Sequence, residues 1–297
     1  SRRIRTIGIY AFFIIGCVIM IFPFVWMFLT SFKTVEESMR IPPDILPETW
    51  KLSNFKDAMA SLPFLALYKN TALMVFWRVV CAVVFSSMAG YAFARIEFPF
   101  KNFIFVLLLS VLMVPGQIFL LPQYQLIQKM GLLNTIPALF LPNLFSAFGT
   151  FLLRQFFMSM PQELEDAAIV DGCNRFQIFG RIMVPLIQPG IAALTIFTFK
   201  FAWNDFMWPL IVNNSMDKLI LGPALSTLQG QYTTQYPMQM AGAVLAVIPL
   251  VVIFFIFQKQ FIDNFHDKRN VLASLTRNGK RNPYRTRVDG LNQPVVL

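Results

Sequence analysis

The sequence predicts an all-α membrane protein with six transmembrane helices and with both termini in the cytoplasm. Two observations support this fold class. The 297 residues are 56% hydrophobic and only 13% charged, with a mean hydropathy of +0.59, whereas about a quarter of the residues of a typical soluble domain are charged. The apolar residues also gather in runs near the length of about 20 residues that a helix needs to cross the hydrocarbon.

Six apolar runs meet this length requirement. In chain order the expected spans are 7–32, 70–94, 103–128, 136–157, 187–212 and 240–261. The first is expected to be a retained helix rather than a signal peptide, because no small-residue processing site follows a short apolar core. Gly90 and its small neighbours favour close helix packing in the second span, and Pro115 and Pro122 are expected to kink or break the third.

The polar residues between the first two spans are expected to form an extracytoplasmic loop. Pro42, Pro43 and Pro47 favour an extended segment over residues 33–67, which cannot lie in lipid because its backbone groups need water. We expect one transmembrane domain over residues 1–265 and a polar cytoplasmic tail over residues 266–297.

The distribution of basic residues orients the spans, because cytoplasmic loops carry an excess of Lys and Arg. The side expected to be cytoplasmic holds Arg2, Arg3, Arg5, Arg95, Lys101, Arg154, Arg175, Arg181 and eight more basic residues from Lys259 onward. Basic residues expected outside are mostly balanced by acids. The formal net charge of +10 is therefore a topology signal, and without a basic stripe interleaved with aromatic residues it does not indicate nucleic-acid binding.

The longest polar-rich insert between apolar spans covers residues 159–189. Ser159 and Gln162 have the spacing of a capping box, whereas Pro161 at the first helical position would make Met160 the cap. Several acids follow Pro161 near the positive end of the helix dipole. Gly172 supplies the backbone freedom that ends a helix. A second amphipathic run then begins with Phe176, Ile178, Phe179 and Ile182 and is closed by Pro185 and Pro189. This pattern predicts two short helices around an Asp-Gly corner.

This segment resembles the cytoplasmic EAA loop of permeases of ATP-binding-cassette (ABC) importers. In that loop Glu-Ala-Ala is followed three residues later by Gly, then by nine residues and Ile-x-Leu-Pro. The chain has Asp166-Ala167-Ala168, Gly172, nine intervening residues and Ile182-Met183-Val184-Pro185. The spacing is intact, while Asp166 replaces the usual Glu and Val184 the usual Leu. The alternative is a surface amphipathic hairpin that has this spacing by accident.

Three further stretches resemble the shorter, maltose-permease-like membrane subunit of carbohydrate-uptake ABC importers. They are Asn70-Thr71 with 89–95, then 151–157, and finally 203–210, which reads WNDFMWPL. The resemblance covers residues 7–261 and implies the ABC importer permease fold in a bacterial inner membrane. The tail beyond Phe261 departs from the short glycine-rich ending of that branch.

The resemblance implies alternating access driven by other chains. A solute-binding protein delivers a sugar or oligosaccharide, a second homologous permease subunit completes the path, and two ATPase subunits close on ATP and Mg. The residues expected to couple ATPase closure to the spans are Glu165, Asp166, Ala167, Ala168, Asp171 and Gly172. A merely structural corner is the alternative. The outer segments 33–67 and 213–237 are expected to contribute to docking of the binding protein.

The chain itself shows no enzymatic chemistry. His266 is the only histidine, which excludes a His-pair metal site and argues against a Ser-His-Asp arrangement. Because the sequence lacks a phosphate-binding glycine loop with Gly-Lys-Ser or Gly-Lys-Thr, we expect no catalysis, cofactor or metal in this chain. Three scattered cysteines indicate packing rather than a disulfide framework.

Residues of the fifth span are expected to line the substrate path. Aromatic faces suit a pyranose ring and an amide suits its hydroxyl groups, which singles out Trp203, Asn204 and Trp208. An interfacial anchor is the alternative role for the tryptophans. In helical register Lys200 shares a face with Trp203, Asn204 and Met207, while Asp205 is turned away. A charge within a span has a partner by default. The partner of Lys200 is either an acid or carbonyl on the companion subunit or an acidic saccharide. In the second case Arg78 would add to the positive electrostatic field at the saccharide.

The competing class is a secondary transporter or channel driven by an ion gradient. Such a protein needs intramembrane acids or inverted repeats of broken helices. The expected spans contain no carboxylate near their centres, and this argues for the ATP-driven class. Co-purification with an ATPase separates the two.

Overall fold

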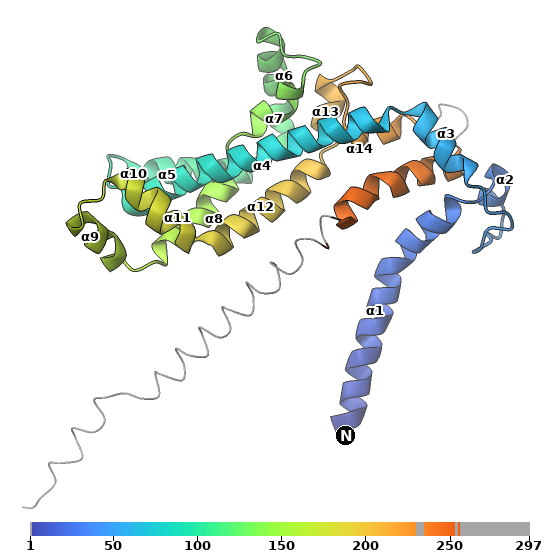
Figure 1. Ribbon diagram of the computed structural model, residues 1–297, viewed down its shortest axis with the longest axis horizontal. Coiled ribbons are helices and arrows are strands. Elements are labelled where there is room, and N and C mark those ends of the chain that lie inside the picture. The colour runs from blue at the N-terminus through green and yellow to red at the C-terminus, as the bar shows by residue number, and fades with distance from the viewer. Residues whose placement is uncertain (1, 230–234, 253–254, 256–297) are drawn as a thin grey trace, which may run out of the picture. The chain divides into compact units, whose positions relative to one another are not determined.

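A computed structural model describes residues 2–229, 235–252 and 255. These residues form helices and turns without any strand (Figure 1), which confirms the all-α class. The described residues up to Ala246 form one compact unit, and the described residues from Val247 onward belong to a second. Among the described residues, two helices are long and apolar enough to cross a membrane, or up to five if each bent pair counts as one span.

The first expected span is helix α1, Arg2–Thr30, whose stretch Thr6–Thr30 is long and apolar enough to cross a membrane. None of its most apolar window is buried inside the protein. The loop that follows is not the extended segment that its prolines predicted, because it contains helices α2, Val35–Ser38, and α3, Ser53–Ser61.

Side chains fold this loop onto the end of α1. Lys33 is only 2% exposed, lies 4.4 Å from the centroid of the Trp26 ring and donates a hydrogen bond from Nζ to the carbonyl of Asp44. The Nδ2 group of Asn54 donates 2.9 Å bonds to the carbonyls of Ser31 and Lys33. These bonds satisfy backbone groups that an extended loop would leave to water.

The second expected span is the long helix α4, Phe64–Arg95, which begins six residues before the predicted start at Asn70. It packs along α8, Ala147–Met158, and α12, Gln188–Trp203 (Figure 1). Glycines allow this close packing: a Cβ atom on Gly90 would lie 3.0 Å from the backbone nitrogen of Arg154. The prediction of close approach in this span is confirmed.

The third expected span is broken where Pro115 predicted. Helices α5, Lys101–Ser110, and α6, Leu120–Lys129, are bent by 99° across the break. The break also contains two short 3-10 turns, η1 at Val111–Met113 and η2 at Gly116–Phe119. Pro122 lies in the first turn of α6, where a missing N–H group is tolerated.

A break was predicted for the third span alone, but the fourth and fifth expected spans are interrupted as well. The fourth is divided into α7, Ile136–Phe140, a 3-10 turn η3, Leu141–Asn143, and α8, with a bend of 49°. The fifth ends its long helix α12 at Trp203 and resumes as α13, Met207–Val212. Pro142 in η3 explains the first break, because proline is tolerated at the start of a helical segment but not in its interior.

The last described elements are α14, Leu221–Ser226, and a helix over Tyr236–Val252. The latter is the described part of the expected sixth span. Apart from Phe255, the remainder of that span and the expected cytoplasmic tail lie outside the described residues.

Candidate coupling loop and substrate path

The loop between α8 and α12 contains the two short helices that its sequence predicted. Helix α9 covers Glu163–Val170, with Gln162 as its N-cap. Met160 is therefore not the cap, because the amides of Glu165 and Asp166 donate to the carbonyl of Gln162, at 2.9 and 3.1 Å. The acids of the first turn still lie at the positive end of the helix dipole.

The turn after α9 is built around Gly172. Its φ of 81° lies in the left-handed region, which glycine adopts without strain. The amide of Cys173 donates to the carbonyl of Ala168 at 2.9 Å, and that of Gly172 to Ile169 at 3.0 Å. This pair of bonds is a Schellman motif, so the predicted role of Gly172 in the turn is confirmed.

The second helix of the loop starts with a capping box at Asn174. Its Oδ1 accepts from the amide of Gln177, and Oε1 of Gln177 accepts from the amide of Asn174, both at 2.9 Å. Helix α10, Arg175–Gln177, continues into a π-helical turn η4, Ile178–Met183, and then α11, Val184–Leu186. The chain bends by 77° between α11 and α12. This is where Pro185 and Pro189 predicted the end of the second amphipathic run.

Glu165 anchors the loop to the rest of the bundle. Its carboxylate is buried, and Oε1 lies 3.2 Å from Nε of Arg95 at the end of α4. Oε2 lies 3.3 Å from the hydroxyl of Tyr91 and 3.4 Å from the guanidinium of Arg175. Arg95 also donates to the carbonyls of Phe157, at 2.7 Å, and Met160. One arginine thus joins α4, α8 and α9.

The residues expected to couple ATPase closure therefore lie on two faces. Glu165 and Ala168 are buried, Ala168 within an apolar cluster that includes Tyr91 and Phe157. The exposed members are Asp166, Ala167, Asp171 and Gly172. The sequence placed these residues together but did not distinguish their faces.

The sequence reasoning did not predict that two apolar residues of this loop are exposed. Val170, at the end of α9, is 86% exposed, and Phe176, in α10, is 80% exposed. Phe176 therefore does not belong to the buried face of the second amphipathic run. The signal that marks both is a bulky apolar side chain next to polar residues in a loop expected to lie outside the membrane.

A second charged cluster lies at the break between α12 and α13. The Asp205 carboxylate is 2.6 Å from a guanidinium nitrogen of Arg78, which is 5% exposed. Arg78 also donates bonds of 3.1 and 2.6 Å to the carbonyl of Leu139. Arg78 was expected to add its charge to the field around Lys200, whereas here Asp205 balances that charge.

The remaining residues expected along the substrate path differ in exposure. Lys200 and Asn204 are exposed, and Trp203 is partly buried with its ring stacked on Phe199. Among the described residues, no carboxylate forms an ion pair with Lys200. Trp208 is 4% exposed, and its indole N–H donates to the carbonyl of Ala138 at 2.9 Å. In this structure Trp208 holds α13 against α7.

Comparison with known proteins agrees with this all-helical fold of broken helices and assigns it to the permease class of ABC importers. Residues 82–265 match the family of binding-protein-dependent transport system inner membrane components. The chain belongs to this family.

Two relatives and one solved structure show how far the likeness extends. The arabinooligosaccharides transport system permease protein AraQ of Halalkalibacterium halodurans is 38% identical over 82% of this chain and 88% of that protein. The sn-glycerol-3-phosphate transport system permease protein UgpE of Salmonella typhi is 32% identical over 90% and 98%. A chain in the crystal structure of a bacterial ABC transporter involved in the import of the acidic polysaccharide alginate is similar in fold. It has a TM-score of 0.77 and 20% identity, over 88% of this chain and 98% of that chain.

Proposed function

We propose that this chain is one of two homologous membrane subunits of an ATP-driven importer for an oligosaccharide. An extracytoplasmic binding protein delivers the sugar, and two partner ATPases hydrolyse ATP with Mg. The chain crosses the bacterial inner membrane several times with both termini inside. The family membership and the sugar permeases among its relatives support this proposal.

The observation that carries the proposal is the two-faced loop of residues 159–189. Glu165 and Ala168 face inward and join the loop to α4 and α8, while Asp166, Val170 and Asp171 are exposed for contact with an ATPase. A movement of the ATPase reaches the spans through the inward face. Coupling of this kind needs an element whose position depends both on ATP binding by the ATPases and on binding of the sugar.

Capture of the ATPase by the assembled transporter tests this coupling role. Val170→Asp places a charge on the exposed apolar tip and is expected to reduce ATPase capture about ten-fold or more, as loss of an interface anchor does. Met130→Asp, which changes an apolar residue 54% exposed outside the loop, is the matched control. Equal capture by the Val170 variant and the unmodified chain would contradict the proposal.

The loop after α1 and the segment after α13 are proposed to form part of the binding-protein dock. The first contains an exposed cluster in which Arg40 pairs with Asp44 at 3.1 Å and with Glu48. Crosslinks from position 44 that never capture a binding protein would count against this dock.

We further propose that the substrate is acidic, because Lys200 is exposed and has no ion pair among the described residues. Trp203 and Asn204 lie next to it at the end of α12 and offer a ring face and an amide to the sugar. The burial and internal partners of Trp208 and Arg78 favour a supporting role for these two. The other proposed partner for Lys200 is an acid or carbonyl on the companion subunit.

Uptake by cells or proteoliposomes separates these two partners for Lys200. If the partner is the cargo, Lys200→Leu depresses uptake of a uronate oligosaccharide far more than that of a neutral one. If the companion subunit supplies the partner, both uptake rates and the yield of the heterodimer fall together. Trp203→Ala is expected to weaken uptake while leaving assembly intact.

The second candidate function is a transporter driven by an ion gradient. Uptake into proteoliposomes distinguishes it, because the ATP-driven importer requires ATP and works with no gradient imposed. Uptake that follows a gradient without ATP would favour the alternative.

A further inference from the structure

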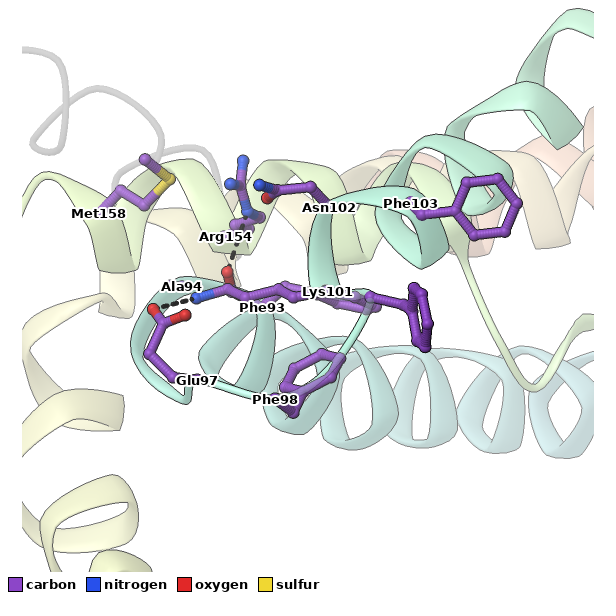
Figure 2. Close-up of a pocket in the computed structure, with 10 residues that line it drawn as sticks. Phe93, Ala94, Glu97, Phe98, Lys101, Asn102, Phe103, Arg154 and Met158 are labelled. Atoms are coloured by element: carbon purple, nitrogen blue, oxygen red, sulfur yellow. Dashed lines mark hydrogen bonds and ion pairs between the residues drawn. The ribbon is translucent and has the colours of Figure 1, made fainter.

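A cavity of 420 Å³ lies between the C-terminal ends of α4 and α8 and the first turn of α5. Figure 2 shows its lining residues, which include Arg154, Lys101, Asn102 and Glu97 together with several phenylalanines. Its volume is within the range of about 300–1,000 Å³ that is usual for small-molecule sites. The coupling loop and the substrate path described above do not use this cavity.

The cavity contains an arginine with unused donors. Nε of Arg154 donates to the carbonyl of Phe93 at 3.2 Å, and the guanidinium lies 4.2 Å from the centroid of the Phe105 ring. These two contacts fix the plane of the group. Among the described residues, no carboxylate forms an ion pair with Arg154. A planar guanidinium held in this way presents its terminal N–H groups in the geometry that matches a phosphate.

Lys101 supplies a second positive charge. Its ammonium is 3.0 Å from Glu97, whose side chain is 89% exposed. Because the Glu97 side chain is open to water, its ion pair with the largely covered Lys101 contributes little, so a phosphate can displace this carboxylate. Helix α5 has no side-chain cap at its N-terminus, so its dipole adds to the attraction for an anion.

The rim of the cavity is apolar. Phe100 is 77% exposed, Phe103 63% and Met158 51%. Because the three helix ends lie on the side that the basic residues orient toward the cytoplasm, the cavity faces the headgroup level of the inner leaflet. A basic interior with an exposed apolar rim matches a ligand that carries a phosphate and acyl chains.

We propose that this cavity binds the phosphate headgroup of an anionic phospholipid of the cytoplasmic leaflet. Basic pockets between transmembrane helices on this side are suited to such headgroups. Arg154 and Lys101 bind the phosphate, and the exposed phenylalanines contact the acyl chains. The leaflet assigned here rests on the orientation in the proposed function, but the binding does not depend on the identity of the cargo.

Native mass spectrometry of the purified transporter tests the proposal, with phosphatidylglycerol titrated into delipidated protein. Loss of one cation is expected to weaken retention of one lipid about five-fold, since a basic residue near an anionic surface contributes about 1 kcal/mol. Arg154→Gln and Lys101→Gln should both show this loss. Arg181→Gln, which removes an exposed charge outside the cavity, should not. Lys101→Gln keeps the test valid if the Arg154 variant fails to fold.

Two further measurements distinguish the source of the phosphate. Phosphatidylcholine of the same acyl chains should be retained more weakly than phosphatidylglycerol, and inorganic phosphate should not displace the bound lipid. Equal retention of both lipids, displacement by free phosphate, or equal loss in the Arg181 variant would overturn the proposal. Capture of the ATPase, measured on the same samples, reports separately on the proposed function.

Discussion

Oε1 of Glu165 in α9 lies 3.2 Å from Nε of Arg95 at the end of α4, and both side chains are at most 10% exposed. The contact joins two segments 70 positions apart in the sequence. Since a charge out of water requires a partner, the coupling loop cannot leave α4 without exposing or stranding both groups. The loop and the end of α4 are therefore expected to move together.

Removing Glu165 is expected to destabilise the protein. Glu165→Ala leaves Arg95, whose side chain is 10% exposed, without its carboxylate partner, and breaking a buried pair costs about 3–5 kcal/mol. Glu163→Ala removes an exposed acid from the same helix and should change the free energy of unfolding by no more than about 0.5 kcal/mol. Thermal unfolding of the assembled transporter measures the difference. Similar shifts for the two variants would show that Glu165 is not an anchor.

Gly172 and Gly180 should respond in opposite directions to alanine. Neither position has a neighbour within 4 Å of an added Cβ, so only the backbone conformation decides. Gly172 has a φ of 81°, and Gly172→Ala should cost about 1–2 kcal/mol. Gly180→Ala lies within a helical turn and should be neutral or stabilising by up to about 1 kcal/mol. The unfolding temperatures of the two variants provide the comparison, and equal shifts would contradict it.

Gly149 is expected to resist enlargement for a steric reason. A Cβ there would lie 2.6 Å from Oγ of Ser86 in α4 and 2.9 Å from Cδ1 of Leu194 in α12, so both side chains would have to shift in a packed interface. Gly149→Ala should cost about 1–3 kcal/mol. Gly8→Ala, in α1, meets no atom within 4 Å and serves as the control. Unaltered thermal stability of the Gly149 variant would show that the Ser86 and Leu194 side chains move aside at little cost.

Asp205 and Lys200 are expected to differ in what their loss affects. Asp205→Asn removes the carboxylate that balances buried Arg78 and should lower stability by about 3–5 kcal/mol. Lys200→Leu changes an exposed residue and should leave the unfolding temperature nearly unchanged while altering uptake. A thermal scan paired with an uptake assay separates the two effects. A large loss of stability in the Lys200 variant would instead favour a structural partner.

The sequence predicted what composition and spacing determine. Hydropathy located the apolar spans, and Gly172 with the acids before it located the corner of the coupling loop. The sequence did not predict the break after Asn204. Asp205 was placed on the opposite face from Lys200 by assuming one continuous helix. The break takes Asp205 to Arg78 instead. Nor does spacing alone decide which of Glu165 and Asp166 faces inward, since that depends on Arg95 at the end of α4.

The break after α7 has a consequence for how this chain can change over time. Its carbonyls at Ala138 and Leu139 accept bonds from Trp208 and Arg78, each more than 60 positions away. Buried backbone groups need hydrogen-bond partners, so we expect the interrupted helix and these two distant side chains to be retained together. A descendant that loses Arg78 or Trp208 is expected to have closed the break by extending α7, or to have gained a substitute donor at the same carbonyl.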